Sequence, residues 1–363
     1  MTAVSRSAPG DLVTAIGLMS GTSLDGIDAA LIRTDGCDRA EAGAFVTIPY
    51  EPAFRERLRA CLGGRGVIHE VERELTELHA AAVARLLEAA GVEATAVDLL
   101  GFHGHTVLHA PDERRTWQIG DGALLARLTG LPVVFDFRTA DVAAGGQGAP
   151  LVPLYHRALA SGLERPLAVL NVGGVANVTY LGADGLVLAF DTGPGNALVD
   201  DWMLRHTGQA FDAGGVLAAA GVVDDGALAT LLAHPYFARP APKSLDRDAF
   251  DPAPVAVLSP ADGAATLTAF TAEAVARALP VLPQPPARWL VTGGGRHNTT
   301  LMAMLVRALN VPVEPVETVG WNGDGLEAEA FGYLAVRSRL SLPLSLPTTT
   351  GVPTPMAGGR FAT

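Results

Sequence analysis

A strand, a short turn of small and polar residues, and a second strand follow one another twice in this chain. The first copy has apolar runs at 15–19 and 27–32 on either side of the turn at 20–26. The second copy spans 166–181, with Gly173 and Gly174 at its turn. The two copies share a pattern rather than letters, and such an internal duplication favours two lobes of the same architecture.

The first turn has the composition of a phosphate-binding loop. Small residues let backbone N–H groups approach an anion, and the hydroxyls of Thr22 and Ser23 can donate hydrogen bonds to it. Asp25 and Asp28 are close enough in the sequence to hold a cation beside that anion. An ordinary Gly/Asp hairpin has the same composition, so the turn alone leaves both interpretations open.

Length and charge limit the class of protein. A chain of 363 residues exceeds what one hydrophobic core usually serves, which predicts two domains. A formal net charge of −12 argues against the basic face that nucleic-acid binding needs. No apolar run is long enough to cross a bilayer, and the first residues lack a secretory signal. From the charge and the apolar runs we expect neither nucleic-acid nor membrane partners. Because Cys37 and Cys61 make no disulfide framework, we expect a cytoplasmic protein.

Strand and helix patterns alternate along the chain, which predicts an α/β fold. Residues 141–153 are rich in Gly, Ala and Pro and predict a hinge. The domains are therefore expected at 1–150 and 151–340, with the tail at 341–363 packed back on the first. The expected strands beyond the hairpins are 44–49, 97–102, 132–137, 185–190 and 289–292, and the expected helices are 53–62, 71–90, 122–129, 299–309 and 323–339, with a further helix starting at Ala197.

Two more turns of small residues follow apolar strands. Gly293, Gly294 and Gly295 come between a strand and a helix, as at many sites where a nucleotide approaches a helix N-terminus. The strand at 185–190 ends on Asp191 and a Gly/Pro turn. These Gly-rich turns, two of which lie on the duplicated hairpins, favour ligand binding over ordinary hairpins. A duplicated pair of lobes would place both phosphate hairpins on opposite walls of one cleft.

The sequence resembles the superfamily of sugar kinases, actin and heat-shock chaperone ATPases, which have two ribonuclease-H-like lobes around a central ATP cleft. Within it, the chain is similar to the anhydro-N-acetylmuramic acid kinase family, and the similarity extends from residue 16 to about residue 359. The order of the matching strings makes the resemblance specific. These strings are MSGTSLDGID (19–28), DFR (136–138), GGQGAPLVP (145–153), NVGGVAN (171–177) and FDTGPGN (190–196).

The resemblance implies a reaction in which 1,6-anhydro-N-acetylmuramic acid, ATP and water give N-acetylmuramic acid 6-phosphate and ADP, a step in recycling cell-wall sugar. It implies Asp191 as the base that activates water, with Glu327 as its helper, and His103 and Arg138 as sugar contacts. It also implies ATP with Mg²⁺ at Asp25 or Asp28, and a homodimer. The ATP contacts that it implies are Gly21, Thr22, Ser23, Leu24, Asp25, Gly26, Ile27, Asp28, Gly173, Gly174, Asn177, Gly293, Gly294, Gly295 and Asn298.

Each implied role has a purely structural alternative. Asp191 can cap a helix or a turn, and Glu327 can be a first-turn carboxylate favoured by the helix dipole. Gly293 to Gly295 can be a packing turn. Asp136 is expected to anchor packing, whereas Arg138 either does the same or binds the lactyl carboxylate of the sugar, for which an arginine fork is suited.

The segment that holds His103, His105 and His109 permits a metal hypothesis, because alternate residues of a strand share a face. No Cys or acidic ligand set completes the shell, so we do not predict zinc. The related family usually has Ser and Gln where this chain has Phe102 and His105. These departures affect the expected sugar contacts rather than the reaction.

Three other functions remain open from the sequence. A related sugar kinase would phosphorylate a free hydroxyl and would incorporate no solvent oxygen into the sugar. A non-catalytic ATPase module would need a partner-binding domain, for which the tail after residue 339 is short. A metal-dependent hydrolase would act without ATP.

Overall fold

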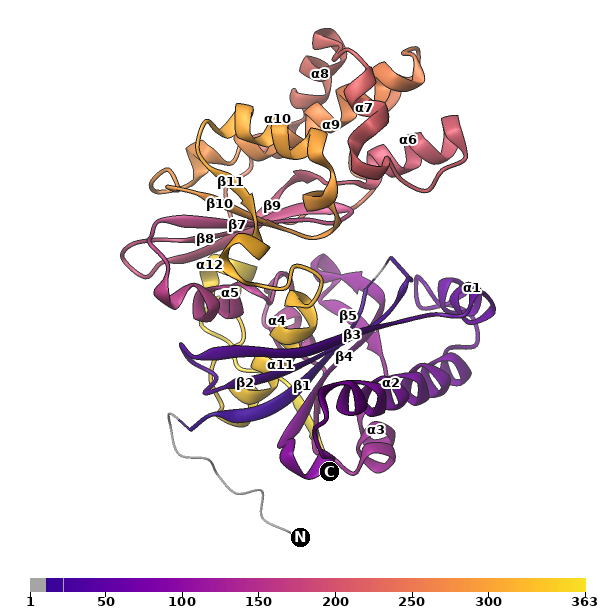
Figure 1. Cartoon of the computed structure of the whole chain (residues 1–363), viewed down its shortest axis with the longest axis vertical. Helices are drawn as coiled ribbons and strands as arrows, with labels where there is room; N and C mark the ends of the chain where they lie inside the picture. Colours follow the sequence, from indigo (N-terminus) through magenta and orange to yellow (C-terminus); the bar gives the residue numbers. More distant parts are fainter. Residues whose placement is uncertain (1–10, 22) are drawn as a thin grey trace. The chain divides into compact units, whose positions relative to one another are not determined.

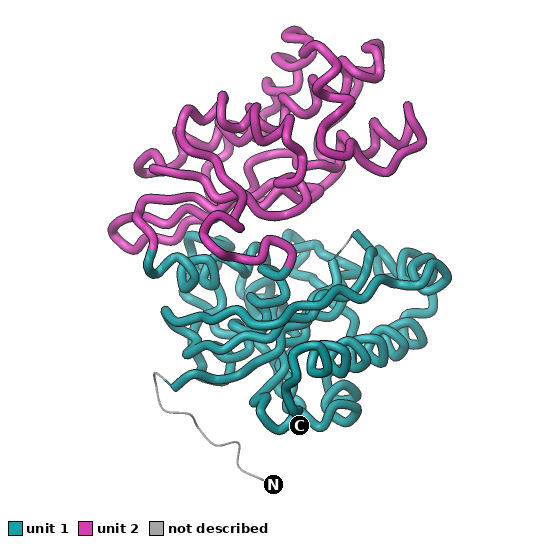
Figure 2. The backbone as a smooth tube through the Cα atoms, viewed as in Figure 1, with its two compact units in different colours: residues 1–162, 325–363 teal, residues 163–324 magenta. Residues whose placement is uncertain are grey.

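The computed structural model describes residues 11–21 and 23–363, and the chain forms two compact units (Figures 1 and 2). Unit 1 contains the N-terminal part up to Gly162 together with Gly325–Thr363, and unit 2 contains Leu163–Asp324. The chain therefore crosses between the units at residues 162–163, not at the expected boundary at residue 150. Residues 325–340, which we expected in the second domain, belong to unit 1.

Unit 1 is built on a mixed sheet with the strand order β12-β6-β4-β1-β2-β3, and β5 pairs with β4. The first three strands form two successive antiparallel pairs, whereas β4 runs parallel to β1, and β6 runs parallel to β4. The strands of this sheet are β1 (Val13–Ser20), β2 (Gly26–Thr34), β3 (Ala40–Pro49), β4 (Leu99–Ala110), β5 (Arg115–Ile119), β6 (Val133–Phe135) and β12 (Arg360–Ala362).

The two faces of β1 have different partners because alternate residues of a strand point to opposite sides. Ile16 and Leu18 join the main core of unit 1, to which Leu75 of α2 also belongs. Between them, a side chain at Gly17 would collide with the Ala328 carbonyl oxygen of α11, at 1.7 Å. Glycine therefore lets α11 lie directly against the sheet. The helices of unit 1 are α1 (Pro52–Ala60), α2 (Ile68–Ala90), α3 (Gly122–Thr129), α4 (Thr139–Ala143), α5 (Pro153–Leu159), α11 (Leu326–Arg339) and α12 (Pro347–Thr350).

Unit 2 has a sheet with the order β11-β10-β7-β8-β9. Its core combines Leu170 of β7 and Val291 of β10 with Leu305 of α10. A second cluster, centred on Trp202 and Phe270, joins the helices that follow β9. The elements of unit 2 are β7 (Leu167–Val172), β8 (Val175–Leu181), β9 (Val187–Pro194), β10 (Trp289–Thr292), β11 (Val313–Pro315), α6 (Ala197–Thr207), α7 (Val216–Ala220), α8 (Asp225–Leu232), α9 (Pro260–Ala276) and α10 (Thr299–Leu309).

The two sheets share one topology. In unit 2, β7, β8 and β9 form the antiparallel pairs, while β10 runs parallel to β7, and β11 runs parallel to β10. Unit 1 has the same order and directions in β6-β4-β1-β2-β3, to which β5 and β12 are added. The duplication predicted from the two hairpins is confirmed, and each sheet has the ribonuclease-H-like arrangement.

Several predicted boundaries need correction. Strand β4 does not end at residue 102 but continues through the histidine segment to Ala110, because it pairs with β5 there. Strand β6 ends at Phe135, since Asp136 adopts a left-handed backbone with φ of 57° that interrupts the strand. The segment at 141–153 is not irregular throughout, because α4 and α5 overlap its two ends.

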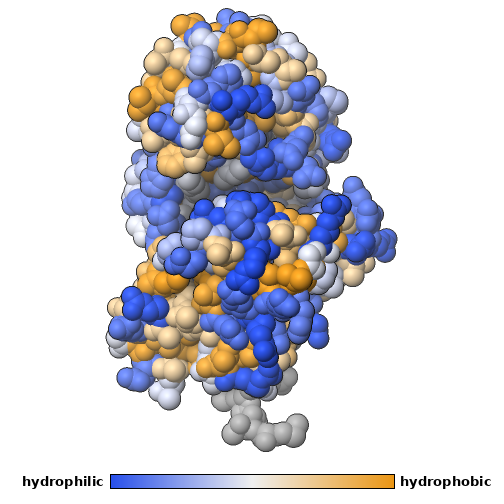
Figure 3. All heavy atoms as spheres, turned by 90° about the vertical axis from the view of Figure 1, so that its right-hand side faces the viewer, coloured by the Kyte–Doolittle hydropathy of each residue, from blue (hydrophilic) through white to orange (hydrophobic). Residues whose placement is uncertain are grey.

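No single described helix is long and apolar enough to span a membrane. One bent pair, 213–220 with 225–232, has the length and composition of a span, but the two helices are bent by 120°. On the face of the molecule in Figure 3, hydrophobic side chains lie among hydrophilic ones.

Candidate functional site

The turn between β1 and β2 is closed by a hydrogen bond from the Leu24 N–H to the Gly21 carbonyl, at 3.1 Å. Leu24 adopts a left-handed backbone with φ of 59°, and its buried side chain anchors the turn in the core. Ile27 is buried in the same core, so at both positions only the backbone is accessible to a ligand. Thr22, the other predicted hydroxyl donor, lies outside the described residues.

The two carboxylates beside this turn already accept hydrogen bonds. The Ser23 hydroxyl donates to Asp25 at 2.7 Å, and the Thr47 hydroxyl donates to Asp28 at 2.6 Å. Asp25 is exposed, while Asp28 lies within β2 and is half-buried. Carboxylate oxygens accept several bonds each and are the ligand type that a hard cation such as Mg²⁺ prefers.

The turn between β7 and β8 is held from behind by the start of α6. The N–H groups of Asn196 and Gly195 donate to the carbonyls of Gly173 and Gly174, at 2.7 and 2.9 Å. The Gly173 and Gly174 N–H groups themselves donate to no acceptor within the described part of the chain. Free N–H groups at a turn of small residues form an anion-binding concavity.

The space around each glycine separates packing from ligand binding. At Gly26 a side chain would meet the Ile48 carbonyl oxygen at 2.4 Å, so packing accounts for that glycine. Gly21, Gly173 and Gly174 have no positive φ, and the nearest atoms to an added Cβ are at 3.4, 3.7 and 3.8 Å. Nothing in the described protein requires glycine at these three positions. The space beside them is large enough for a phosphate oxygen, and an added Cβ would fill part of it.

The glycine turn after β10 is largely structural. A side chain at Gly293 would meet the Asn171 Oδ1 atom at 2.3 Å, and one at Gly295 would meet Val172 at 2.5 Å. Asn298 caps α10 by accepting the Leu301 N–H at 2.9 Å. Only Gly294 has open space beside it, with the nearest atom at 3.8 Å. The packing alternative therefore explains most of this turn, and Gly294 remains the candidate for ligand approach.

Asp191 lies in the second half of β9 and is clamped by the segment at 236–245. The Leu245 N–H donates to its Oδ2 atom at 2.7 Å, and the Tyr236 hydroxyl donates to its main-chain carbonyl at 2.5 Å. Its own N–H donates to the Lys243 carbonyl at 2.9 Å. The Oδ1 atom has no hydrogen-bond partner among the residues that the structure describes. One carboxylate oxygen is thus fixed and the other is available.

The protonation of Asp191 is also unusual. Burial raises the pKa of its carboxyl to about 7, and the Leu245 N–H opposes this shift only in part. Asn177 is directly opposite Asp191 in the β8–β9 pair, so the structure brings these two predicted residues together. A carboxyl with a pKa near neutrality suits a general base, which must exchange protons near the working pH.

In unit 1, His103, Arg138 and Glu327 form one group. The Arg138 Nε and Nη2 atoms contact His103 Nε2 at 3.1 and 3.0 Å, and the Arg138 Nη1 atom donates to the Gly148 carbonyl at 2.6 Å. Burial lowers the pKa of the Arg138 guanidinium to about 10, although the nearby carboxylates of Glu327 and Asp141 raise it. All three sides of this guanidinium are therefore already engaged.

His103 is bonded on both ring nitrogens. Its Nδ1 atom donates to the Gly104 carbonyl at 2.9 Å, which leaves Nε2 as the acceptor for Arg138. Burial, together with the Arg138 charge, lowers the pKa of the imidazole well below 6.5, so the ring is neutral. The expected sugar contact of His103 through a ring nitrogen would require one of these bonds to open.

The two residues that depart from the related family have different surroundings. His105 Nδ1 contacts the Ser20 hydroxyl at 2.9 Å, and Ser20 contacts the Tyr50 hydroxyl at 2.6 Å. The Phe102 ring is buried and packs edge-on against His79 at 4.8 Å. Among the described residues no group of three or more His, Cys, Asp or Glu side chains could hold a metal ion. His105 therefore supports the base of the turn, whereas Phe102 packs against α2.

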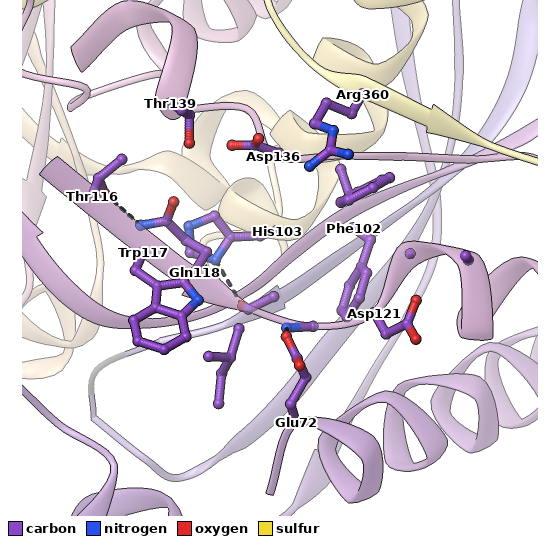
Figure 4. A pocket seen from close by; sticks show the side chains of 16 residues that line it. Glu72, Phe102, His103, Thr116, Trp117, Gln118, Asp121, Asp136, Thr139 and Arg360 are labelled. Atoms are coloured by element: carbon purple, nitrogen blue, oxygen red, sulfur yellow. Dashed lines mark hydrogen bonds between the residues drawn. The ribbon is translucent and has the colours of Figure 1, made fainter. Parts of the chain in front are cut away.

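A cavity of about 440 Å³ opens within unit 1 beside His103 (Figure 4). Its volume falls in the ~300–1,000 Å³ range of small-molecule sites. Asp136, for which we predicted only a packing role, lines it. The lining residues that were not predicted include Trp117 of β5, Asp121 at the start of α3 and Arg360 of β12. None of them has a sequence signal, because tertiary pairing alone brings β5, α3 and β12 together.

The predicted residues thus form two sets. Unit 1 contains the first turn and the group of His103, Arg138 and Glu327, and unit 2 contains the second turn, Asn177, Asp191 and the turn after β10. Lys243 and Leu245, which hold Asp191, and Tyr236, which orients its backbone, were not predicted.

Comparison with known proteins shows the family to which the chain belongs. The sequence model of the anhydro-N-acetylmuramic acid kinase family matches this chain over residues 13–361. Relatives with that name from Paramagnetospirillum magneticum and Rhodospirillum rubrum are each 60% identical, over 95% and 96% of this chain and 98% and 94% of their own length. A solved structure, component A of the (R)-2-hydroxyglutaryl-CoA dehydratase of Acidaminococcus fermentans, covers 90% of this chain and 99% of its own at 11% identity, with a TM-score of 0.49. On the sequence relatives and the matched residues, the chain belongs to the anhydro-N-acetylmuramic acid kinase family.

Proposed function

We propose that this protein is an ATP-dependent kinase that opens 1,6-anhydro-N-acetylmuramic acid with water and phosphorylates O6. The products are N-acetylmuramic acid 6-phosphate and ADP, and the reaction serves the recycling of peptidoglycan. The relatives' shared name supports the substrate and the reaction. The observation that carries the mechanism is Asp191, a clamped carboxyl with one available oxygen and a pKa near neutrality.

Asp191 is the base in this proposal. The bicyclic substrate has no free 6-hydroxyl, so its C1–O6 bond must break before O6 can accept a phosphoryl group. Asp191 Oδ1 takes a proton from a water molecule whose oxygen attacks C1. The electron pair of the broken C1–O6 bond stays on O6, which attacks the γ-phosphorus and releases ADP. Phosphoryl capture of O6 replaces the carboxylic acid that a glycoside hydrolase uses to protonate the leaving oxygen.

The two hairpin turns supply the phosphate contacts. Free N–H groups at Gly173 and Gly174, and the open space at Gly21, fit phosphate oxygens. Phosphoryl transfer depends mainly on positioning and charge stabilisation, so such rigid donors contribute without chemical participation. Mg²⁺ would neutralise phosphate charge when held by Asp25 or Asp28, which fit it by their oxygen ligands.

Glu327 and Arg138 have supporting roles in unit 1. Glu327 lies in the first turn of α11, exposed and close enough to Arg138 to raise the pKa of its guanidinium. We propose that the pair holds the sugar side of the site, with Glu327 as a second polar contact for water. Arg138 also fixes His103 and the loop at Gly148, which makes it a positioning residue.

Oligomeric state and location are also proposals. A homodimer follows from the family resemblance, and light scattering on purified protein measures it. Cys37 and Cys61 are both free thiols, which fits a reducing cytoplasm, where ATP is present.

The Asp191→Asn variant tests the mechanism. It keeps the size and the Leu245 contact but removes the base, so ATP binding should stay within about twofold, whereas kcat should fall by about 10³-fold or more. Asp184→Asn is the matched control, because Asp184 is an exposed turn residue whose oxygen accepts the Leu186 N–H, and asparagine can do the same. A near-normal kcat for Asp191→Asn would contradict the assignment and make Glu327 the next candidate.

A further inference from the structure

The substrate in the proposed function has a charged group that the reaction does not use. N-Acetylmuramic acid bears a lactyl ether that ends in a carboxylate, and a site that recognises it needs a cation or a set of donors. Arginine suits this task because its planar fork binds both carboxylate oxygens. Arg138 was the candidate from the sequence.

Arg138 is not available for this contact. Its Nε and Nη2 atoms contact His103 Nε2, and its Nη1 atom donates to the Gly148 carbonyl at 2.6 Å. Turning the fork toward a ligand would break these bonds and leave a buried carbonyl and a buried imidazole without partners, which is costly. Another cation is needed.

Arg360 meets the requirement. Among the described residues, it is the only Arg or Lys side chain that lines the 440 Å³ cavity beside His103. Its guanidinium carbon lies 5.3 Å from the centre of the Phe135 ring, and no carboxylate of the described chain lies within 4.0 Å of its nitrogens. Figure 4 shows this guanidinium directed into the space that Asp136 also faces.

The position of Arg360 is set by the backbone. Strand β12 pairs antiparallel with β6, and this register puts Arg360 directly opposite Phe135. Gly359, with φ of 88°, precedes it, and a side chain there would meet the Ser338 hydroxyl at 2.6 Å. The guanidinium is therefore presented from a paired strand of the sheet, although its side chain is exposed.

The acidic side chains that line the rest of the cavity leave Arg360 as the favourable position for a carboxylate. Glu72 accepts the Gly120 N–H at 3.0 Å, and Asp121 accepts the Leu124 N–H at 2.9 Å. With Asp136 they make the remaining wall negative, which suits hydroxyl groups and repels an anion. In the view of Figure 4 the Trp117 indole, 41% exposed, lies on the opposite side from Arg360 and offers a flat apolar surface to a sugar ring or acetyl group.

We infer that this cavity is a carboxylate-reading subsite in which Arg360 binds the lactyl carboxylate of the sugar and Trp117 contacts its apolar face. The inference rests on the proposed function and makes the C-terminal strand a specificity element. A sugar whose lactyl group is blocked as an amide, as when a peptide is attached, then loses the ion pair and is a poorer substrate.

The experiment compares two substrates and three proteins. Initial rates are measured with 1,6-anhydro-N-acetylmuramic acid and with its primary lactyl amide, for the wild type, Arg360→Ala and Arg127→Ala. Arg127 is an exposed arginine of α3 that does not line the cavity, which makes its variant the matched control. Arg360→Lys is added because lysine keeps the charge without the fork.

The wild type should prefer the acid over the amide by about tenfold in KM, and Arg360→Ala should remove that preference by raising KM for the acid alone. Arg360→Lys should keep part of it, and Arg127→Ala all of it. An equal loss on both substrates, or none, would overturn the subsite. If the wild type phosphorylates neither sugar, the proposed function fails instead, so the two failures are distinguishable.

Discussion

At the scale of single residues, the pKa and orientation of Asp191 depend on groups that surround it in the fold. A motif match could identify the residue. The groups that hold it by hydrogen bonds come later in the chain, since Tyr236 and Leu245 lie 45 and 54 residues away. No local pattern predicts such contacts. The same holds for His103 and Arg138, which were predicted as sugar contacts but are largely engaged with each other.

The raised pKa of Asp191 predicts a pH profile. A general base works only when ionised, and burial raises the pKa of this carboxyl to about 7. The value of kcat/KM should therefore be low at pH 5.5, rise about tenfold per pH unit below the midpoint and level off above about pH 7.5. Initial rates measured from pH 5 to pH 9 at constant ionic strength give this profile of kcat/KM. A pH profile of kcat/KM with its midpoint near pH 4 would contradict the raised pKa of Asp191.

At the scale of elements, the hairpins could be predicted and the edge strands could not. Long apolar runs around a turn determined β1–β2 and β7–β8, and their capped neighbours α3 and α10 were also predicted with the observed bounds. Strand β12, with three residues, has no pattern of its own and depends entirely on pairing with β6. The cavity beside β12 could therefore not be predicted from the sequence.

The open space at the second turn makes a prediction for that element. Gly174→Ala should fold with unchanged or slightly higher stability, because its Cβ has room and its backbone is in a region that alanine adopts. Its affinity for ATP should fall by about tenfold or more, since the methyl group occupies the space of a phosphate oxygen.

Gly26→Ala is the contrasting control for this element. It should unfold more easily, because its Cβ would collide with the Ile48 carbonyl at 2.4 Å. Calorimetric ATP titration and thermal melting of both variants measure the two effects. Normal ATP affinity in a well-folded Gly174→Ala protein would contradict the phosphate role of the turn.

At the scale of the whole molecule, the two chain segments of unit 1, one before residue 163 and one after residue 324, are joined at Asp141. This buried carboxylate accepts the Gly148 N–H at 2.7 Å and the Thr350 hydroxyl at 2.6 Å, and it also accepts the Ser345 hydroxyl. The segment predicted as a hinge is thereby anchored to the C-terminal tail. The sequence predicts a tail that packs on the first domain, but no local pattern identifies Asp141 as the residue that holds it.

Removing this carboxylate should destabilise unit 1. Asp141→Ala would leave three donors without their acceptor, at a cost of about 3 kcal/mol in the free energy of unfolding. Asp112→Ala, at an exposed position, should change it by less than about 0.5 kcal/mol. Urea unfolding followed by circular dichroism compares the two. Equal stability of both variants would show that the tail is held by other contacts.

The central claim is that water opens the anhydro ring while O6 takes the phosphoryl group, and isotope labelling tests it most directly. The protein is incubated with ATP, Mg²⁺ and 1,6-anhydro-N-acetylmuramic acid in ¹⁸O-water, and the product is analysed by mass spectrometry with fragmentation. We predict a 6-phosphorylated sugar with one solvent oxygen at C1. A phosphorylated sugar without label at C1, or no phosphorylated sugar at all, would contradict the account.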